Sequence, residues 1–325
     1  MGTNHINKSM NALVGDSIED GDRMLLGFVL DGNVSQAALD SFIKGWDIET
    51  APMRSILLVA DLMRKNPELV FPDSVAPRLN GVLSYCRFKN LKGEAVFSKV
   101  ANALAECGVP FVPIGDVAMK AFRPDFMRRI DTIDLLVPDA GCELAGKVVS
   151  QYDGDTSIII HKSLNDNIFS RAAASGSHSP DSSLPCPEDM VSFLLLNLYY
   201  NLLSGKGAKN CLTVFPDIKY LAGLKESFDT GIVWEDAVAG RFAFQVMLAS
   251  RVAGEVLPGI FPERWPETTA LSGNKLKCRE VDFLFRRDVL SDSGKGWKFL
   301  KSALKKGSDM GLVPSALKRV ICSFK

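Results

Sequence analysis

The sequence predicts an α+β protein in which a small mixed β-sheet core is flanked by N-terminal helices and a large C-terminal helical region. Two observations support this fold class. Apolar residues recur at helical spacing before residue 108 and again after residue 188, whereas short apolar runs separated by turn residues occupy 109–170. Hydrophobic residues make up 46% of the 325-residue chain, which is enough for a sizeable core.

The chain before the core is predicted to hold a flexible tail, 1–20, and a helical region, 21–108. The tail is polar and has no charged-then-apolar signal pattern. The helical region begins with two stripes of apolar residues at helical spacing: Leu39, Phe42, Ile43 and Trp46, then Ile56, Leu57, Ala60 and Met63.

Two further helices are expected within 74–107, separated by a break near Lys92-Gly93. The second of them is the clearer one, and Gly108 is its expected C-terminal stop. Its apolar side is formed by Val96, Phe97, Val100 and Leu104.

The core segment, 109–170, alternates short strands with short helices. An apolar run ends in Gly115-Asp116, and Pro138 stops a second, clean strand. The expected order is strand 109–114, helix 117–122, strand 133–137, helix 140–151 and strand 156–161. This order is typical of a small αβ unit.

The chain after the core is predicted to be a linker, 171–187, followed by a helical region, 188–325. The linker is rich in small residues and proline, and acidic residues open the helix that follows it. The helices are expected at 188–204, 214–226, 234–256, 277–291, 294–306 and after Pro314.

Composition excludes several classes of protein. Lys plus Arg and Asp plus Glu are both 38, so no basic excess favours nucleic acid or an anionic membrane as a partner. The seven cysteines are scattered without a CxxC pair, which is typical of thiols in a reducing compartment. The longest apolar runs are too short to span a membrane, so a cytoplasmic protein without a membrane partner is expected.

One stretch, Ile114–Val137, is arranged like an active site. It places Gly-Asp after a strand, then a helix, an arginine-bearing loop, and a strand that begins Thr132-Ile133-Asp134. The stretch resembles the nucleotidyltransferase fold, and more closely a family of uncharacterised bacterial nucleotidyltransferase-like proteins. In that family the corresponding motifs are Lys-Gly, an Arg, Asp-Ile-Asp-Leu-Leu-Val, and an acidic residue two before a His. Landmarks in the same order extend the resemblance over about 24–260.

The resemblance implies a site in which carboxylates hold Mg²⁺ against a nucleoside triphosphate. This chain departs from the pattern at Thr132, where the first Asp is expected, at Ile159, where the third carboxylate is expected, and at Ile114, where the Lys is expected. The positions that match are Gly115, Arg128, Asp134 and His161.

The candidate catalytic residues are therefore Asp134, which is also the candidate metal ligand, and Asp131. Asp131 lies three residues before Asp134, and a bulge could turn both toward one face. The candidate nucleotide-binding residues are Gly115, Asp116, Arg128 and His161. A purely structural role stays open for each. Asp134 could pair with Arg128, and Arg123, Arg128 and Arg129 could form a solvated face.

Three functions follow as hypotheses. The first is a non-catalytic relative that binds a nucleotide or a protein partner and needs no cofactor. The alternative is an active Mg²⁺-dependent enzyme that moves a nucleoside monophosphate from a triphosphate onto a small molecule or protein. The second alternative is a helical scaffold for a partner protein. This hypothesis predicts that the helices at 190–203 and 242–257 expose apolar faces.

Overall fold

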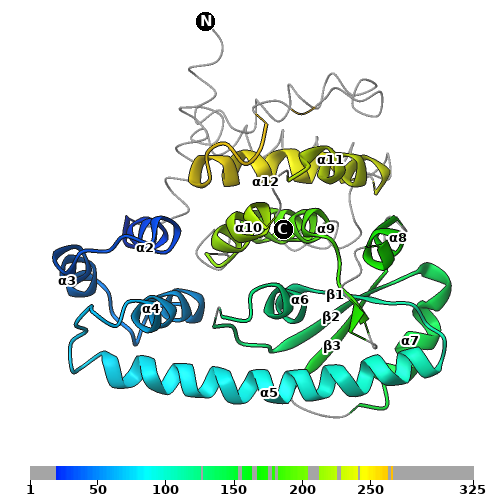
Figure 1. Ribbon diagram of the computed structural model, residues 1–325, viewed down its shortest axis with the longest axis horizontal. Helices are drawn as coiled ribbons and strands as arrows, with labels where there is room; N and C mark the ends of the chain where they lie inside the picture. Colours follow the sequence, from blue (N-terminus) through cyan, green and yellow to red (C-terminus); the bar gives the residue numbers. More distant parts are fainter. Residues whose placement is uncertain are drawn as a thin grey trace, which may run out of the picture. The chain divides into compact units, whose positions relative to one another are not determined.

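The computed structural model of the chain describes residues 20–125, 127–152, 156–162, 167–174, 178–179, 182–203, 212–224, 228–240, 242–262 and 265. The chain divides into two units, and all of these residues except Trp265 belong to the unit Ile18–Glu263. That unit is mostly helical with a small mixed sheet, which confirms the predicted α+β class (Figure 1). The expected tail up to residue 19 and the helices expected beyond residue 276 lie outside the described residues.

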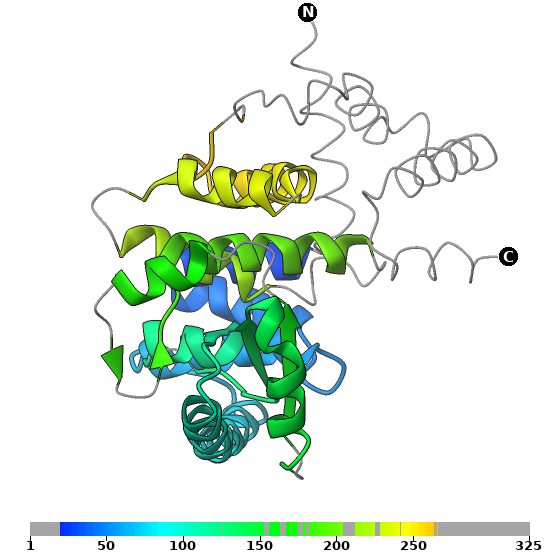
Figure 2. The ribbon, with the colours of Figure 1, turned by 90° about the vertical axis from the view of Figure 1, so that its right-hand side faces the viewer.

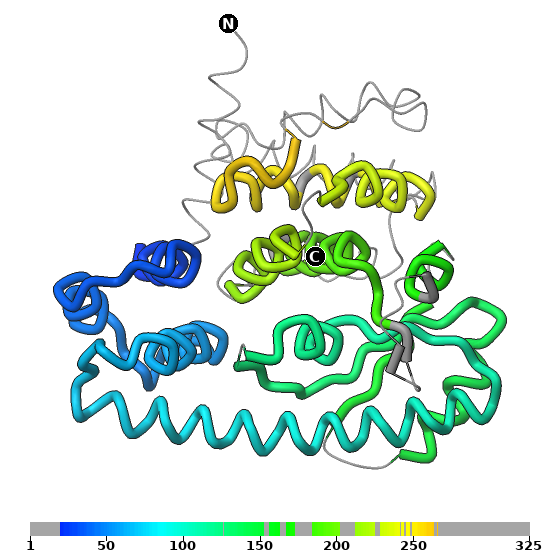
Figure 3. Tube along the Cα trace, viewed as in Figure 1, coloured from blue at the N-terminus to red at the C-terminus, as the bar shows by residue number. Residues whose placement is uncertain are grey.

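The N-terminal part is helical, as the apolar stripes predict. Ser35 caps its second helix by accepting a hydrogen bond from the Ala38 amide at 3.3 Å, and Pro52 precedes the first turn of the third. The helices are α2 (Asp20–Asp31), α3 (Gln36–Gly45), α4 (Met53–Lys65) and α5 (Ala76–Glu106). Figure 3 shows α4 lying against both α2 and α5.

Helix α5 is continuous, so the break expected near Lys92-Gly93 is wrong. A Cβ at Gly93 would lie 2.6 Å from Cγ2 of Ile130. The neighbouring Asn90 accepts a hydrogen bond from the Ile130 amide through Oδ1 at 3.0 Å. Glycine therefore serves here to let the loop before the central strand lie directly against the helix.

The core sheet has three strands, with the central one paired differently on its two sides. β2 (Thr132–Val137) is antiparallel to β1 (Val112–Ile114) and parallel to β3 (Ser157–Lys162). The connections are α6 (Gly115–Phe122) between β1 and β2, and α7 (Cys142–Val149) between β2 and β3. The predicted order of strands and helices in this segment is therefore confirmed.

The two faces of the sheet have opposite character, because side chains alternate along a strand. On one face Ile133, Leu135 and Val137 are completely buried in a cluster that includes Val100 and Leu104 of α5. The other face carries the half-buried Thr132, Asp134 and Leu136. The second face is the one left for a functional site.

Helix α8 (Asn167–Ala174) packs on this second face, where its Ile168 and Ala172 share a cluster with Leu136. The helices that follow in the chain are α9 (Pro187–Leu203), α10 (Val214–Gly223), α11 (Thr230–Ala239) and α12 (Ala243–Val256). Helix α9 contacts α10, α11 and α12, and it separates α11 and α12 from the αβ core (Figures 1 and 2). The segment expected to be a linker, 171–187, holds the end of α8 and the short strands β4 (His178–Ser179) and β5 (Ser182–Ser183).

The single helix expected at 234–256 is instead two helices, α11 and α12. The Gly240 amide donates to the Asp236 carbonyl at 2.8 Å and ends α11. The Phe242 amide then donates to the Ala237 carbonyl at 2.8 Å, which brings the Phe242 ring directly against Gly240. A side chain at residue 240 would collide with that ring, so the glycine permits the turn.

Across the part of the chain that the structure describes, no helix is both long enough and apolar enough to cross a membrane.

Candidate functional site

Asp134 lies on the second, half-buried face of β2 and interacts with two side chains. Its Oδ1 is 2.7 Å from Nε2 of His161, the residue on β3 that was predicted as a nucleotide-binding group. Its Oδ2 accepts a hydrogen bond from the Thr132 hydroxyl at 3.0 Å. The sheet thus brings Asp134 and His161 together, although 27 residues separate them in sequence.

Gly115 completes this group of sequence-predicted residues. It follows β1 directly and adopts a φ of +68°, a backbone conformation that residues other than glycine rarely adopt. A Cβ at this position would lie 3.1 Å from Oδ2 of Asp134. The glycine therefore both makes the turn into α6 and leaves room for the carboxylate.

The cross-strand neighbours of Asp134 are both isoleucines. Ile114 of β1 pairs with Asp134 on one side, and Ile159 of β3 pairs with it on the other. These are the positions where the resemblance expects a Lys and a carboxylate. Among the described residues there is no group of three or more His, Cys, Asp and Glu side chains that could hold a metal ion.

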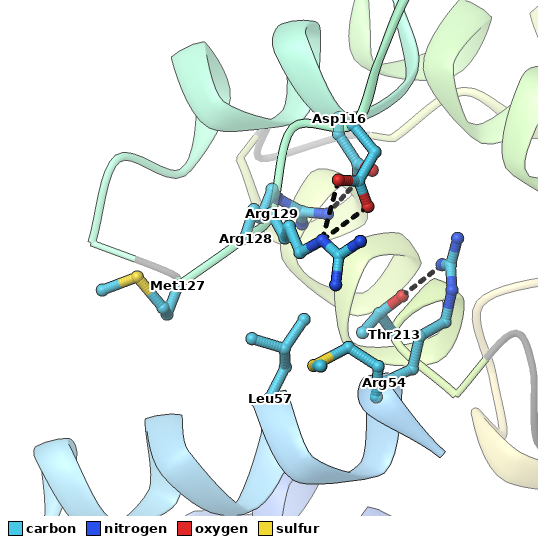
Figure 4. A pocket seen from close by; sticks show the side chains of 9 residues that line it. Arg54, Leu57, Asp116, Met127, Arg128, Arg129 and Thr213 are labelled. Atoms are coloured by element: carbon cyan, nitrogen blue, oxygen red, sulfur yellow. Dashed lines mark hydrogen bonds and ion pairs between the residues drawn. The ribbon is translucent and has the colours of Figure 1, made fainter. Parts of the chain in front are cut away.

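Asp116, Arg128 and Asp131 line a different place, a pocket of about 170 Å³ next to the loop between α6 and β2. Asp131 pairs there with Arg129, at 2.7 Å between Oδ2 and Nε. Figure 4 shows Arg128 and Arg129 above Leu57 of α4. Asp116 pairs here with Arg128 and Asp131 pairs with Arg129, whereas Asp134 interacts with Thr132 and His161.

Arg128 is buried and engaged by two carboxylates. Its guanidinium is 3.3 Å from Oδ1 of Asp116 and also pairs with Asp217 of α10. Burial raises the pKa of Asp217 above its usual range. The sequence offered Arg128 as a partner for Asp134, but the structure pairs it with these other carboxylates.

Sequence reasoning missed two further residues of this small pocket, Arg54 and Thr213. Nη1 of Arg54 donates to the Thr213 hydroxyl at 2.9 Å, and so links the first turn of α4 to the start of α10 (Figure 4). The residues are 159 positions apart, so no local pattern could have paired them.

A larger cavity, about 380 Å³, opens at the Asp134 face of the sheet. The sheet contributes Ile114, Leu136, His161 and Lys162 to its wall. Helices and the turn before α12 contribute the rest, which includes Ile168, Arg171, Asp189, Ser192, Phe193, Leu196, Asn197, Tyr200, Asp236 and Phe242. Its lining is thus mainly apolar and aromatic, with a few charged groups.

The charged groups on the helical side of this cavity form one cluster. Arg171 of α8 pairs with Asp189 of α9 and, at 2.5 Å, with Asp236 of α11. Burial and the neighbouring Asp189 carboxylate raise the pKa of Asp236 to about 7. Sequence reasoning did not place Asp236, because its partner Arg171 lies 65 residues away.

The backbone and thiol of Cys186 complete the cluster. The amide of Cys186 donates to Oδ2 of Asp189 at 3.2 Å, and its thiol lies 2.9 Å from the same oxygen. Burial raises the pKa of this thiol to about 12, so the sulfur stays protonated and donates to the carboxylate. Asp189 therefore caps the start of α9 while it also binds Arg171.

Comparison of the chain with protein-family models, with curated proteins and with solved structures finds no match.

Proposed function

We propose that the chain is a non-catalytic binding protein built on a nucleotidyltransferase-like core, and that it binds a small organic ligand without a divalent metal. The observation that carries the proposal is the register of the sheet. Asp134 has Ile114 on one side and Ile159 on the other, where nucleotidyl transfer needs charged groups.

The chemistry of Mg²⁺ supports this proposal. Mg²⁺ takes about six oxygen ligands in octahedral geometry, and in nucleotidyl transfer several of them come from carboxylates. Here one carboxylate faces the sheet surface, and its oxygens already interact with His161 and Thr132. Isoleucine side chains supply no ligand, so the site lacks the charge that would neutralise a triphosphate.

The cavity lined by His161, the partner of Asp134, supports retained binding. Ligand pockets usually measure about 300 to 1,000 Å³ and combine an apolar lining with a few placed polar groups. The cavity of about 380 Å³ has that size and composition.

The scaffold alternative receives less support. The helices it expects to expose, 190–203 and 242–257, bury most of their apolar side chains in their described parts, although Tyr200 is exposed. These include Val191, Leu194, Leu195, Leu198, Val246, Ala249, Val252 and Ala253.

Titration of ATP, GTP, CTP and UTP, with Mg²⁺ or with EDTA, tests the proposal. We expect that Mg²⁺ does not increase the affinity of the protein for any of the four nucleotides. We also expect incubation with each triphosphate and Mg²⁺ to release no pyrophosphate and to transfer no nucleotide. Asp134→Ala is the comparison variant. Mg²⁺-dependent binding or transfer that disappears in Asp134→Ala would overturn the proposal in favour of the active enzyme.

A further inference from the structure

We infer that the 380 Å³ cavity selects an aromatic monocation, a ring-bearing amine, over neutral or anionic ligands of the same shape. The inference rests on the proposed metal-free binding function and names its ligand class. What carries it is the juxtaposition of two carboxylates, Asp189 and Asp236, with three aromatic side chains around one cavity.

The aromatic side chains favour a flat ring. Phe193 and Tyr200 come from α9, and Phe242 comes from the turn that precedes α12. Phe193 also meets the His161 ring edge to face, with centroids 6.5 Å apart, so the aromatic wall is continuous with the sheet. Aromatic faces attract both other rings and organic cations.

The charges on the helical wall favour a positive group. Asp189 and Asp236 share one guanidinium, that of Arg171, so the three side chains carry an excess negative charge when both carboxylates are ionised. Lys162 also borders the cavity, but it pairs with Asp139 at 2.6 Å and both side chains are largely exposed. A ligand phosphate would meet the acidic excess, whereas an ammonium group would balance it.

The same wall makes the selection depend on pH. The pKa of Asp236 is raised to about 7, chiefly by burial, so its carboxyl is mostly protonated at pH 6 and mostly ionised at pH 8. The charged or titratable groups on the elements around it are Arg171 of α8, Cys186 just before α9, Glu188, Asp189, Tyr199 and Tyr200 of α9, Arg251 and Glu255 of α12, and His161 and Lys162 of β3. An amine that requires the ionised form should bind about tenfold more tightly at pH 8 than at pH 6.

Three ligands with one indole ring provide the test. Tryptamine carries an ammonium group, tryptophol a neutral hydroxyl and indole-3-acetate a carboxylate. Calorimetric titration into the full chain at pH 8 should rank them in that order, with tryptamine about tenfold or more tighter than indole-3-acetate. Only tryptamine should weaken at pH 6, because its amine stays protonated at both values and the protein carboxyl does not stay ionised.

Two variants test whether the ligands bind in this cavity and whether Asp236 causes the preference for the amine. Asp236→Asn should bring tryptamine down to the affinity of tryptophol and remove its pH dependence. Leu196→Trp places an indole inside the cavity and should abolish binding of all three ligands. Its control is Leu144→Trp, on the half-exposed side of α7, which should bind like the wild type.

The inference is overturned if indole-3-acetate binds as tightly as tryptamine, or if none of the three ligands binds. It is also overturned if Leu196→Trp binds like the wild type. None of these outcomes changes the expected nucleotide titrations, so the ligand class and the metal-free function fail separately.

Discussion

Asp134 and Gly115 show how single residues shape the candidate site. The carboxylate lies against a glycine with a φ of +68° and interacts with an imidazole and a hydroxyl. Each neighbour constrains it, because the glycine leaves space and His161 and Thr132 fix its oxygens. This geometry orients a carboxylate well, but the cross-strand neighbours Ile114 and Ile159 supply no second carboxylate beside it.

Gly115→Ala should destabilise the protein by about 1 to 3 kcal/mol, because a side chain strains a positive φ and the new Cβ would press on Asp134. Gly146→Ala is the matched control, since this helical glycine of α7 has nothing within 4 Å of an added Cβ. Helix propensity predicts that the control is neutral or slightly stabilising. Thermal unfolding measures both, and equal midpoints for the two variants would contradict the strain argument.

Asp236 should make the stability of the fold depend on pH. Its folded pKa of about 7 lies above the unfolded value, so between about pH 4 and pH 7 the folded state holds more protons. The stability that this group contributes is therefore present at low pH and is lost as the pH rises through 7.

From pH 5 to pH 8 the loss should be on the order of 2 kcal/mol, and it should be absent in Asp236→Asn. Chemical denaturation at the two pH values gives the comparison. Glu235→Gln, at an exposed position of the same helix, should keep the wild-type difference. An Asp236→Asn profile identical to the wild-type profile would rule out this carboxyl as the source.

At the scale of elements, α5 depends on close contact more than on helix propensity. The helix runs for 31 residues through a glycine that propensity alone disfavours. Gly93 is buried under Ile130, whereas Gly81 of the same helix is exposed and has nothing within 4 Å of an added Cβ. A comparison of the two positions therefore distinguishes the effect of side-chain packing from the effect of helix propensity within one helix.

Gly93→Ala should destabilise the protein by about 1 to 3 kcal/mol, because the added methyl overlaps the Ile130 side chain. Gly81→Ala should instead stabilise it by about 0.5 to 1 kcal/mol through helix propensity. Urea denaturation of both variants measures the two free energies of unfolding. If Gly93→Ala is as stable as Gly81→Ala, the contact does not explain why the helix carries glycine there.

Sequence patterns predicted the elements best where burial is regular. Alternating burial along β2 and the apolar stripe of α5 follow directly from the periods of strand and helix. The predictions that were wrong both concern glycines, Gly93 and Gly240. At Gly93 the helix continues beneath Ile130, a residue far along the chain, whereas at Gly240 a local turn brings the Phe242 ring against the glycine. The spacing of apolar residues predicts neither contact.

In the candidate site, too, some of the residues were predicted from the sequence and others were not. The order of motifs predicted that Gly115, Asp134 and His161 belong together, and adjacent strands bring them together. Arg171 and its two carboxylates were not predicted, because ion pairs across 18 and 65 residues leave no periodic trace. A sequence shows which residues could carry charge, but the fold decides which charges meet.

Across the whole described unit, polar pairs join α10 and the residue before it to the αβ core and to α4. Arg128, in the loop before β2, pairs with Asp217 of α10, and both side chains are at most 3% exposed. Arg54 reaches Thr213 next to the same helix. These contacts fix α10 against the parts of the chain that line the smaller pocket.

Asp217→Ala should therefore destabilise the protein by about 3 to 5 kcal/mol, because it removes the buried carboxylate that pairs with the buried Arg128 guanidinium. The double variant Arg128→Met/Asp217→Leu should recover most of that loss, since it removes both charges and fills their space. Glu143→Gln, which breaks an exposed pair with Lys147, is the control and should cost less than about 1 kcal/mol. Denaturant midpoints rank the three variants. A double variant no more stable than Asp217→Ala would mean that the charges themselves, and not the burial of one left alone, hold α10 to the core.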